Sequence, residues 1–91
     1  MKYRVEYTTY AVRQLKKLDK GILAFIISYI DNKLVGCENP RLYGKALLGS
    51  LNYKWRYRIG DYRILAKIND GLVTITVVEV GHRSDIYDSN K

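Results

Sequence analysis

The first apolar positions of the chain alternate with charged ones. Tyr3, Val5 and Tyr7 are separated by charged residues, and this period of two predicts a strand over residues 2–7. Apolar residues then recur every three or four positions, which predicts a helix capped by Thr8 or Thr9 and a second helix over residues 22–34. The apolar stripe of the second helix is wide, so we expect this helix to pack along one side of a sheet. Gly36 is placed to end it.

The remainder of the chain predicts a connection followed by three strands. Residues 37–52 are interrupted by glycine, proline and asparagine, and they predict a long connection with one short helical turn. Two-residue hairpin turns at Gly60-Asp61 and Asp70-Gly71 separate strands expected at 53–59, 62–69 and 72–80. The order β-α-α-β-β-β predicts an α+β fold, a mostly antiparallel sheet with two N-terminal helices packed on one face. With 91 residues, we expect one domain over residues 1–91.

The two hairpin turns set a register for the last three strands. Closing the first turn pairs Tyr57 with Ile64, because directly opposed residues share a face of a sheet. Closing the second turn sets Val77 opposite Ile64 and therefore sets Ile75 opposite Ala66. These pairs build an apolar face for the helices. A shift of one residue at either turn would destroy this agreement, which supports the register.

The opposite face of the sheet is predicted to be basic. It carries five cationic side chains from two neighbouring strands, namely Lys54, Arg56, Arg58, Arg63 and Lys67. The third strand is predicted to add Thr74, Thr76, Val78 and Val80. Like charges opposed across strands destabilise a sheet by up to about 1 kcal/mol per pair. This arrangement favours a sheet that receives an anion, and the alternative is that the cationic side chains extend into water.

Composition and charge narrow the class of protein. Lys and Arg number 16 against nine Asp and Glu, a formal charge of +7 that favours RNA, DNA, an acidic protein or an anionic membrane. Cys37 is the only cysteine, which we interpret as a small buried hydrophobe, and a single His with a single Cys makes no metal-ligand set. Glycine patterns for nucleotide cofactors are absent, so we expect no cofactor. Neither a signal peptide nor a membrane span is predicted, and we expect a cytoplasmic protein.

The segment after the last strand adds candidate chemistry at the end that also holds Gly60. His82 is the only histidine, the residue type best suited to proton exchange near neutral pH. Arg83 has the charge and the planar fork that suit a phosphate, and Tyr87 offers a ring on which a base can stack.

Four segments together resemble the RelE branch of the RelE/ParE toxins. They are YKWRYRIGDYR at 53–63, KALLG at 45–49, VEVGHR at 78–83 and IY at 86–87. The likeness covers nearly the whole chain and includes the order of its elements. It implies the RelE-like microbial ribonuclease fold and the toxin of a type II toxin-antitoxin system. Such toxins are mRNA interferases, endoribonucleases that cut mRNA in the ribosomal A site by metal-free attack of a ribose 2′-hydroxyl on the adjacent phosphate.

The resemblance also implies roles for individual residues. Lys54 and Arg56 match two strand lysines of the family, Arg63 its phosphate-binding arginine, Arg83 its tail arginine and Tyr87 its terminal tyrosine. The sequence departs from the family pattern at two points. Arg56 stands in place of the second lysine, and arginine is a poor base. The stretch between Arg83 and Tyr87 is also shorter than in the founding RelE pattern. We therefore expect Arg56 and Arg63 to stabilise the phosphorane and Lys54 or His82 to act as base. Arg83 or His82 would serve the leaving group, with RNA contacts from Lys45, Arg58 and Lys67.

Other interpretations and partners follow from the same resemblance. The ParE branch shares the fold, poisons DNA gyrase and does not cut RNA, but has no evident need for this cationic set. A non-enzymatic RNA-binding module and a degenerate toxin kept as part of a repressor complex are further alternatives. The expected partners are a cognate antitoxin, the ribosome and its mRNA, with operator DNA bound only through the antitoxin complex and no membrane.

Overall fold

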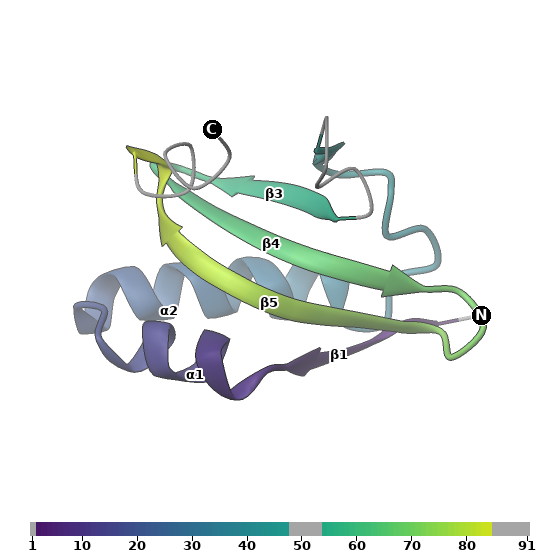
Figure 1. Cartoon of the computed structure of the whole chain (residues 1–91), viewed down its shortest axis with the longest axis horizontal. Helices are drawn as coiled ribbons and strands as arrows, with labels where there is room; N and C mark the ends of the chain where they lie inside the picture. The colour runs from purple at the N-terminus through teal and green to yellow at the C-terminus, as the bar shows by residue number, and fades with distance from the viewer. Residues whose placement is uncertain (1, 48–53, 85–91) are drawn as a thin grey trace.

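The computed structural model describes residues 2–47 and 54–84. Its elements are β1 (Arg4–Tyr7), α1 (Thr9–Lys16), α2 (Lys20–Tyr29), the π-helical turn η1 (Ile30–Leu34), β2 (Lys45–Ala46), β3 (Trp55–Ile59), β4 (Tyr62–Asn69) and β5 (Thr74–His82). The strands form one sheet in the order β1-β5-β4-β3-β2, in which β1 runs parallel to β5 and the other neighbours are antiparallel. Both helices lie on one side of this sheet (Figure 1). The predicted α+β fold is confirmed.

Local signals in the sequence explain where the helices begin and end. The Thr8 hydroxyl accepts a hydrogen bond from the Ala11 amide at 3.1 Å and so caps α1. The helix α2 continues into η1, where the Val35 amide donates to the Ile30 carbonyl at 2.9 Å. Gly36 then adopts a φ of 78°, which ends the helical segment as predicted.

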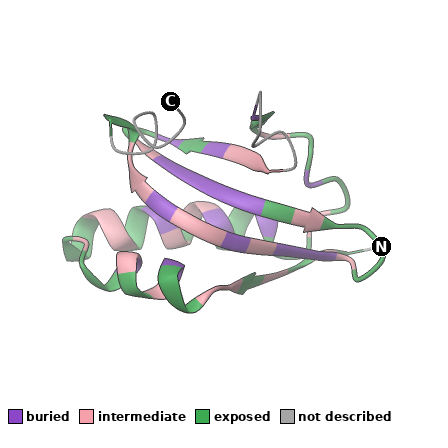
Figure 2. Ribbon diagram, in the orientation of Figure 1, coloured by how far each residue is buried: buried purple, intermediate pink, exposed green. Residues whose placement is uncertain are grey.

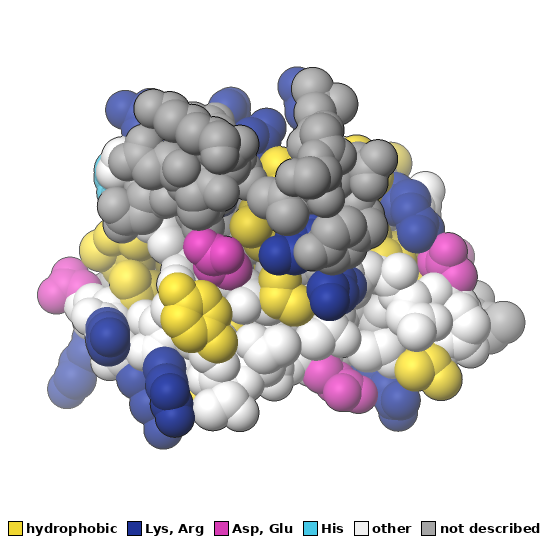
Figure 3. All heavy atoms as spheres, viewed as in Figure 1, with side chains coloured by type: hydrophobic (Ala, Val, Ile, Leu, Met, Phe, Trp, Pro, Cys, Tyr) yellow, Lys and Arg dark blue, Asp and Glu magenta, His cyan; other side chains and the backbone are white. Residues whose placement is uncertain are grey.

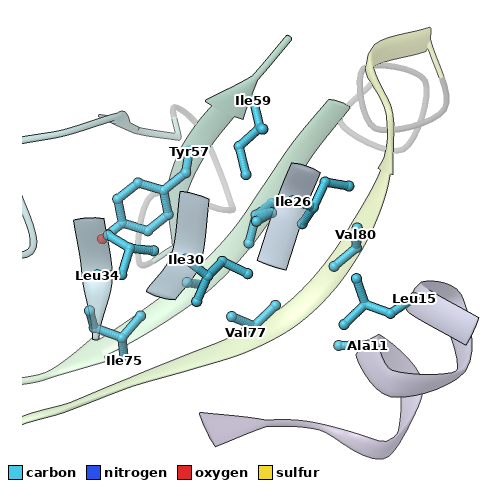
Figure 4. Close-up of a cluster of buried hydrophobic side chains, with 12 residues drawn as sticks. Ala11, Leu15, Ile26, Ile30, Leu34, Tyr57, Ile59, Ile75, Val77 and Val80 are labelled. Carbon is cyan, nitrogen blue, oxygen red and sulfur yellow. The ribbon is translucent and has the colours of Figure 1, made fainter. Parts of the chain in front are cut away.

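One hydrophobic core lies between the helices and the sheet. Its buried side chains come from α1, α2, η1 and alternate positions of β3, β4 and β5 (Figure 4). Tyr57 is among them, and its hydroxyl donates to the carbonyl of Pro40 at 2.6 Å. Figure 2 shows bands of buried and less buried residues along β5, whereas residues 63–66 of β4 are all buried. The core therefore fixes which face of each strand is turned away from the helices.

The connection before β3 differs from its prediction. Within the described part, residues 37–47, it contains no helical turn but a two-residue strand, β2, which pairs Lys45 with Arg56 and Ala46 with Trp55. Residues 48–52 of the predicted connection lie outside the described residues. The prediction missed β2 because two residues are too few to show a hydrophobic alternation. This strand makes the sheet five-stranded and brings Lys45 to β3.

The predicted pairing of β3 with β4 is confirmed, whereas that of β4 with β5 is wrong by two residues. Tyr57 pairs with Ile64 across the Gly60-Asp61 turn, as expected. Across the second turn Asn69 pairs with Thr74, so four residues rather than two form the loop. Ile75 consequently lies opposite Ile68, not Ala66. A shift of two keeps the side chains of residues 74–77 on their predicted faces, which is why alternation could not detect it.

A bulge in β5 corrects one further prediction. Leu65 pairs with Glu79 and Ala66 pairs with Val77, so Val78 is an extra residue in β5. Beyond it the alternation is reversed, and Val80 lies opposite Ile64 within the core. Val80 was predicted on the basic face and is instead buried against the helices. The same reversal decides where His82 lies.

Candidate functional site

The outer face of the sheet, the face turned away from the helices, carries Arg56, Arg58 and Arg63. Arg58 pairs directly with Arg63, and Arg56 pairs with Leu65 two positions further along β4, so the three arginines share this face as predicted. Lys67 lies further along β4, opposite Thr76. Lys54 immediately precedes β3, where its carbonyl accepts a hydrogen bond from the Leu47 amide at 3.1 Å.

A small hollow on the outer face is lined by cations. Gly44, Lys45, Arg56 and Arg58 surround a volume of about 210 Å³. Lys45 and Arg58 are exposed and Arg56 is half-buried, so these side chains offer ammonium and guanidinium groups to solvent. A guanidinium binds a phosphate through two parallel N–H donors, and an ammonium adds a flexible point charge. The hollow thus suits one phosphate group of a larger polyanion.

Arg63 is placed differently from the other cations. It is only 3% exposed, and its Nη1 donates to the carbonyls of Gly60 at 3.1 Å and Tyr62 at 3.0 Å. These bonds hold the guanidinium against the β3–β4 turn. Strand alternation predicted the face of Arg63 but could not predict this burial, because burial depends on what lies over the strand.

The outer face also holds a small hydrophobic cluster that sequence reasoning missed. Leu47 and Leu65 are buried together, with Val78 packed against them. The bulge at Val78 and the strand β2, which leads into Leu47, build this cluster, and neither is visible in the hydrophobic pattern. It stands beside Arg56, since Arg56 and Leu65 are directly paired.

The structure does not bring His82 to the outer face. His82 lies opposite Tyr62 on the helix side of the sheet, and the two rings meet edge to face with centroids 5.5 Å apart. Gly81, one residue earlier, lies opposite Arg63. The Arg83 amide donates to the Asp61 carbonyl at 2.8 Å, which holds Arg83 beside the turn that Arg63 contacts. Tyr87 lies outside the described residues.

Two searches of the described residues complete the site. No group of three or more His, Cys, Asp or Glu side chains that could hold a metal ion occurs in residues 2–47 and 54–84. Over the same ranges, no helix combines the length and the apolar character that a membrane crossing requires.

Comparisons with known proteins identify the family. A family model described as the ParE toxin of the type II toxin-antitoxin system, parDE, matches residues 5–87. Toxin RelG of Mycobacterium tuberculosis is 38% identical over 87 residues, which cover 96% of this chain and 98% of RelG. Toxin RelE of the same organism is 32% identical over 88 residues, which cover 97% of this chain and 89% of that toxin.

Solved structures agree with these relatives. A chain of the toxin-antitoxin complex RelBE2 from Mycobacterium tuberculosis superimposes with a TM-score of 0.83 at 35% identity, covering 91% of this chain and 100% of that chain. The isolated Escherichia coli RelE toxin shares the fold, with a TM-score of 0.72 at 22% identity over 96% of this chain and 93% of that chain. The chain belongs to the RelE/ParE superfamily of type II toxin-antitoxin toxins. The family predicted from the sequence is confirmed.

Proposed function

We propose that this toxin is an endoribonuclease that cuts mRNA on the ribosome and thereby inhibits translation. The observation that carries the proposal is the hollow of about 210 Å³ on the outer face, in which Lys45, Arg56 and Arg58 converge. Three cations from two neighbouring strands match the charge that develops when a phosphodiester becomes a phosphorane. The 38% identity to toxin RelG and the 32% identity to toxin RelE support the RelE branch.

The proposed reaction needs no group beyond the chain, its substrate and water. The ribose 2′-hydroxyl gives up its proton to a base as its oxygen attacks the adjacent phosphorus, and a 2′,3′-cyclic phosphate forms. The bond to the 5′-oxygen breaks, and this oxygen takes up a proton from water. Arg56 would bind the phosphoryl oxygens, and buried Arg63 would add positive charge from within the sheet. Lys54 would accept the proton of the 2′-hydroxyl, and Arg83 would stabilise the leaving oxygen. The position of His82 on the helix side favours Lys54 and Arg83 over His82 for these roles.

A cognate antitoxin is the proposed protein partner. Solved structures similar to this chain include the RelBE2 complex of Mycobacterium tuberculosis and the RelE-RelB complex from Pyrococcus horikoshii. Acidic side chains of an antitoxin would be attracted to the outer face for the same reason as phosphate, since a cationic patch selects complementary charge. Bound there, the antitoxin would exclude RNA and hold the toxin inactive.

Gyrase poisoning is the second candidate, because the matching family model describes ParE toxins. Induced expression in bacteria separates the two activities. A ribonuclease produces new mRNA 5′ ends within translated regions, which primer extension detects, without an early SOS response. A gyrase poison induces the SOS response and leaves mRNA intact, and this result would reject the ribonuclease proposal.

Variants then connect the activity with the outer face. Arg56→Gln and Arg83→Gln should each slow ribosome-dependent cleavage by about a hundredfold or more, the scale of losing one group that stabilises transition-state charge. Lys2→Gln removes the same charge from an exposed position at the start of the chain and should cleave like the wild type. Wild-type activity in both site variants would refute the assignment.

A further inference from the structure

A second hollow lies on the helix side of the sheet, between α1 and the end of β5. Its volume is about 450 Å³, and it is lined by Tyr10, Arg13 and Gln14 of α1 and by Lys17, the residue that follows the helix. Arg13 and Gln14 lie three and four residues after Tyr10, and Lys17 lies four residues after Arg13, so the four side chains are neighbours along one side of the helix. We call this hollow the α1 groove. It is separate from the outer hollow, which lies among Gly44, Lys45, Arg56 and Arg58.

The opposite wall of the α1 groove comes from the bulged end of β5. Glu79, Gly81 and His82 line it together with Tyr62 of β4. The amide oxygen of Gln14 accepts a hydrogen bond from the Val80 amide at 2.7 Å, which ties the helix to the strand. Because both walls are held by this bond and by the packing of α1 on β5, the groove is part of the folded framework.

Charge and aromatic surface occur together in the α1 groove. Arg13 and Lys17 are exposed cations, and Glu79 also lines the groove. Tyr10 is 57% exposed, so its ring is available for stacking. Figure 3 shows basic side chains over α1 beside hydrophobic and acidic groups. Cations beside an accessible ring are the pattern that binds single-stranded nucleic acid, the cations holding phosphate and the ring a base.

His82 lies in the wall of the groove, and its ring contacts Ser84. The Ser84 amide donates to Nδ1 of His82 at 3.3 Å, and the Ser84 hydroxyl oxygen lies 3.0 Å from the same nitrogen.

We propose that the α1 groove binds one nucleotide of a single-stranded RNA, with a phosphate between Arg13 and Lys17 and the base against Tyr10. The inference rests on the proposed function, because RNA is then the polyanion that the toxin must hold. It adds a contact on the helix side of the sheet to those proposed on the outer face. A nucleotide offers a phosphate and a flat base one sugar apart, which fits the groove better than the carboxylates of an acidic peptide do.

The test measures RNA binding apart from RNA cleavage. A short 2′-O-methyl RNA, which has no free 2′-hydroxyl to attack, is titrated with the full-length protein over a range of salt concentrations and followed by fluorescence anisotropy. The double variant Arg13→Gln/Lys17→Gln should bind at least about fivefold more weakly. Its plot of log K against log salt should be shallower by about 0.7, since the variant no longer neutralises one phosphate of the single strand.

Two further variants separate stacking from general charge. Tyr10→Leu keeps an apolar side chain but loses the ring, and it should weaken binding about fivefold or more without changing the salt slope. Lys2→Gln removes a charge remote from the groove and should bind like the wild type. Unchanged thermal unfolding of each variant shows that the fold is intact, which the exposed positions of Arg13, Lys17 and Tyr10 lead us to expect.

The outcomes distinguish this inference from the proposed function. Wild-type affinity and slope in the double variant would overturn the groove while leaving ribosome-dependent cleavage unaffected. Loss of RNA binding in the double variant, combined with a wild-type protein that never cuts mRNA, would support the groove and reject the ribonuclease. If the double variant loses binding of a fluorescent glutamate-rich peptide but not of the RNA, the groove is a protein-docking site and the proposal is wrong.

Discussion

Gly44 shapes the outer hollow through a contact that only glycine permits. Its φ is 78°, in the left-handed region, and a Cβ atom at this position would fall against the carbonyl oxygen of Arg56. The backbone before β2 can therefore approach β3 closely, which places Lys45 opposite Arg56. Gly36 has the same φ of 78° but open space around the position of a Cβ. Comparing substitutions at these two glycines therefore distinguishes the cost of backbone strain from the cost of steric overlap.

Gly44→Ala should destabilise the fold by about 2–5 kcal/mol, the sum of left-handed strain and overpacking. Gly36→Ala should lose only the strain, about 1–2 kcal/mol. Urea denaturation of both variants measures the two losses. Equal losses would show that the close approach of Gly44 to Arg56 has no energetic importance.

Tyr57 joins the core to the connection before β2. Its ring is fully buried and its hydroxyl donates to the buried carbonyl of Pro40 at 2.6 Å. Burial also raises the pKa of Tyr57, so the hydroxyl stays protonated and remains a donor. The bond holds the residues that lead to the outer hollow against β3.

Tyr57→Phe should lower the free energy of unfolding by about 1–3 kcal/mol, because it leaves a buried carbonyl without its donor. Tyr10→Phe removes a hydroxyl from a side chain that is 57% exposed and should change stability by less than about 0.5 kcal/mol. Chemical denaturation monitored by circular dichroism gives both values. A Tyr57→Phe protein as stable as the Tyr10→Phe control would contradict the importance of this bond.

Among the elements, three segments meet at Asp70 in the β4–β5 loop. The carboxylate accepts hydrogen bonds from Arg41 Nη1 at 3.0 Å and Nη2 at 3.2 Å, and from the Tyr3 hydroxyl at 2.7 Å. The Arg41 bond is the largest cause, and the Tyr3 bond the second, of a pKa of Asp70 below its ordinary 3.8. Since the folded pKa is below the unfolded one, the stabilisation is complete above the unfolded pKa and is lost as pH falls through the folded pKa.

Asp70→Asn should therefore unfold at a lower temperature than the wild type at neutral pH. The gap should shrink as pH falls below 3.8, because the wild-type carboxylate then takes up its proton. Asp31→Asn, which removes an exposed carboxylate from η1, serves as the control at the same pH values. A gap for Asp70→Asn that does not change with pH would show that its charge contributes nothing to the fold.

The elements also show how far a sequence can predict this fold. Gly60-Asp61 is a two-residue turn with a positive φ at Gly60, so its register followed directly from the sequence. Asp70-Gly71 resembles such a turn, but the loop extends to Val73, which adopts a positive φ that β-branched residues rarely take. Side-chain alternation has a period of two and cannot distinguish registers that differ by two.

The candidate site could likewise be predicted only where the strands pair regularly. Arg56, Arg58 and Arg63 could be assigned to one face because their strands pair across a regular turn. His82 could not, because the extra residue Val78 lies in an apolar run where the sequence gives no sign of a bulge. The position of Lys45 opposite Arg56 depends on a strand of two residues, so the hydrophobic pattern could not predict it either.

For the whole molecule, the sheet separates two basic regions. The outer hollow holds Lys45, Arg56 and Arg58, and the α1 groove on the helix side holds Arg13 and Lys17. A formal charge of +7 favours association with a polyanion from any direction, and the two regions would then define where it is held. The outer hollow would serve the reacting phosphate and the groove a neighbouring nucleotide.

The most direct test of the proposed ribonuclease is single-turnover cleavage of mRNA on programmed ribosomes, comparing the wild type with Arg56→Gln and Lys2→Gln. We expect the wild type and Lys2→Gln to cut at the same rate and to leave a 2′,3′-cyclic phosphate. Arg56→Gln should be slower by about a hundredfold or more, and replacing the 2′-hydroxyl at the scissile position with hydrogen should abolish cleavage. Cleavage by Arg56→Gln at the wild-type rate, or of the 2′-deoxy substrate, would contradict phosphoryl transfer on the outer face.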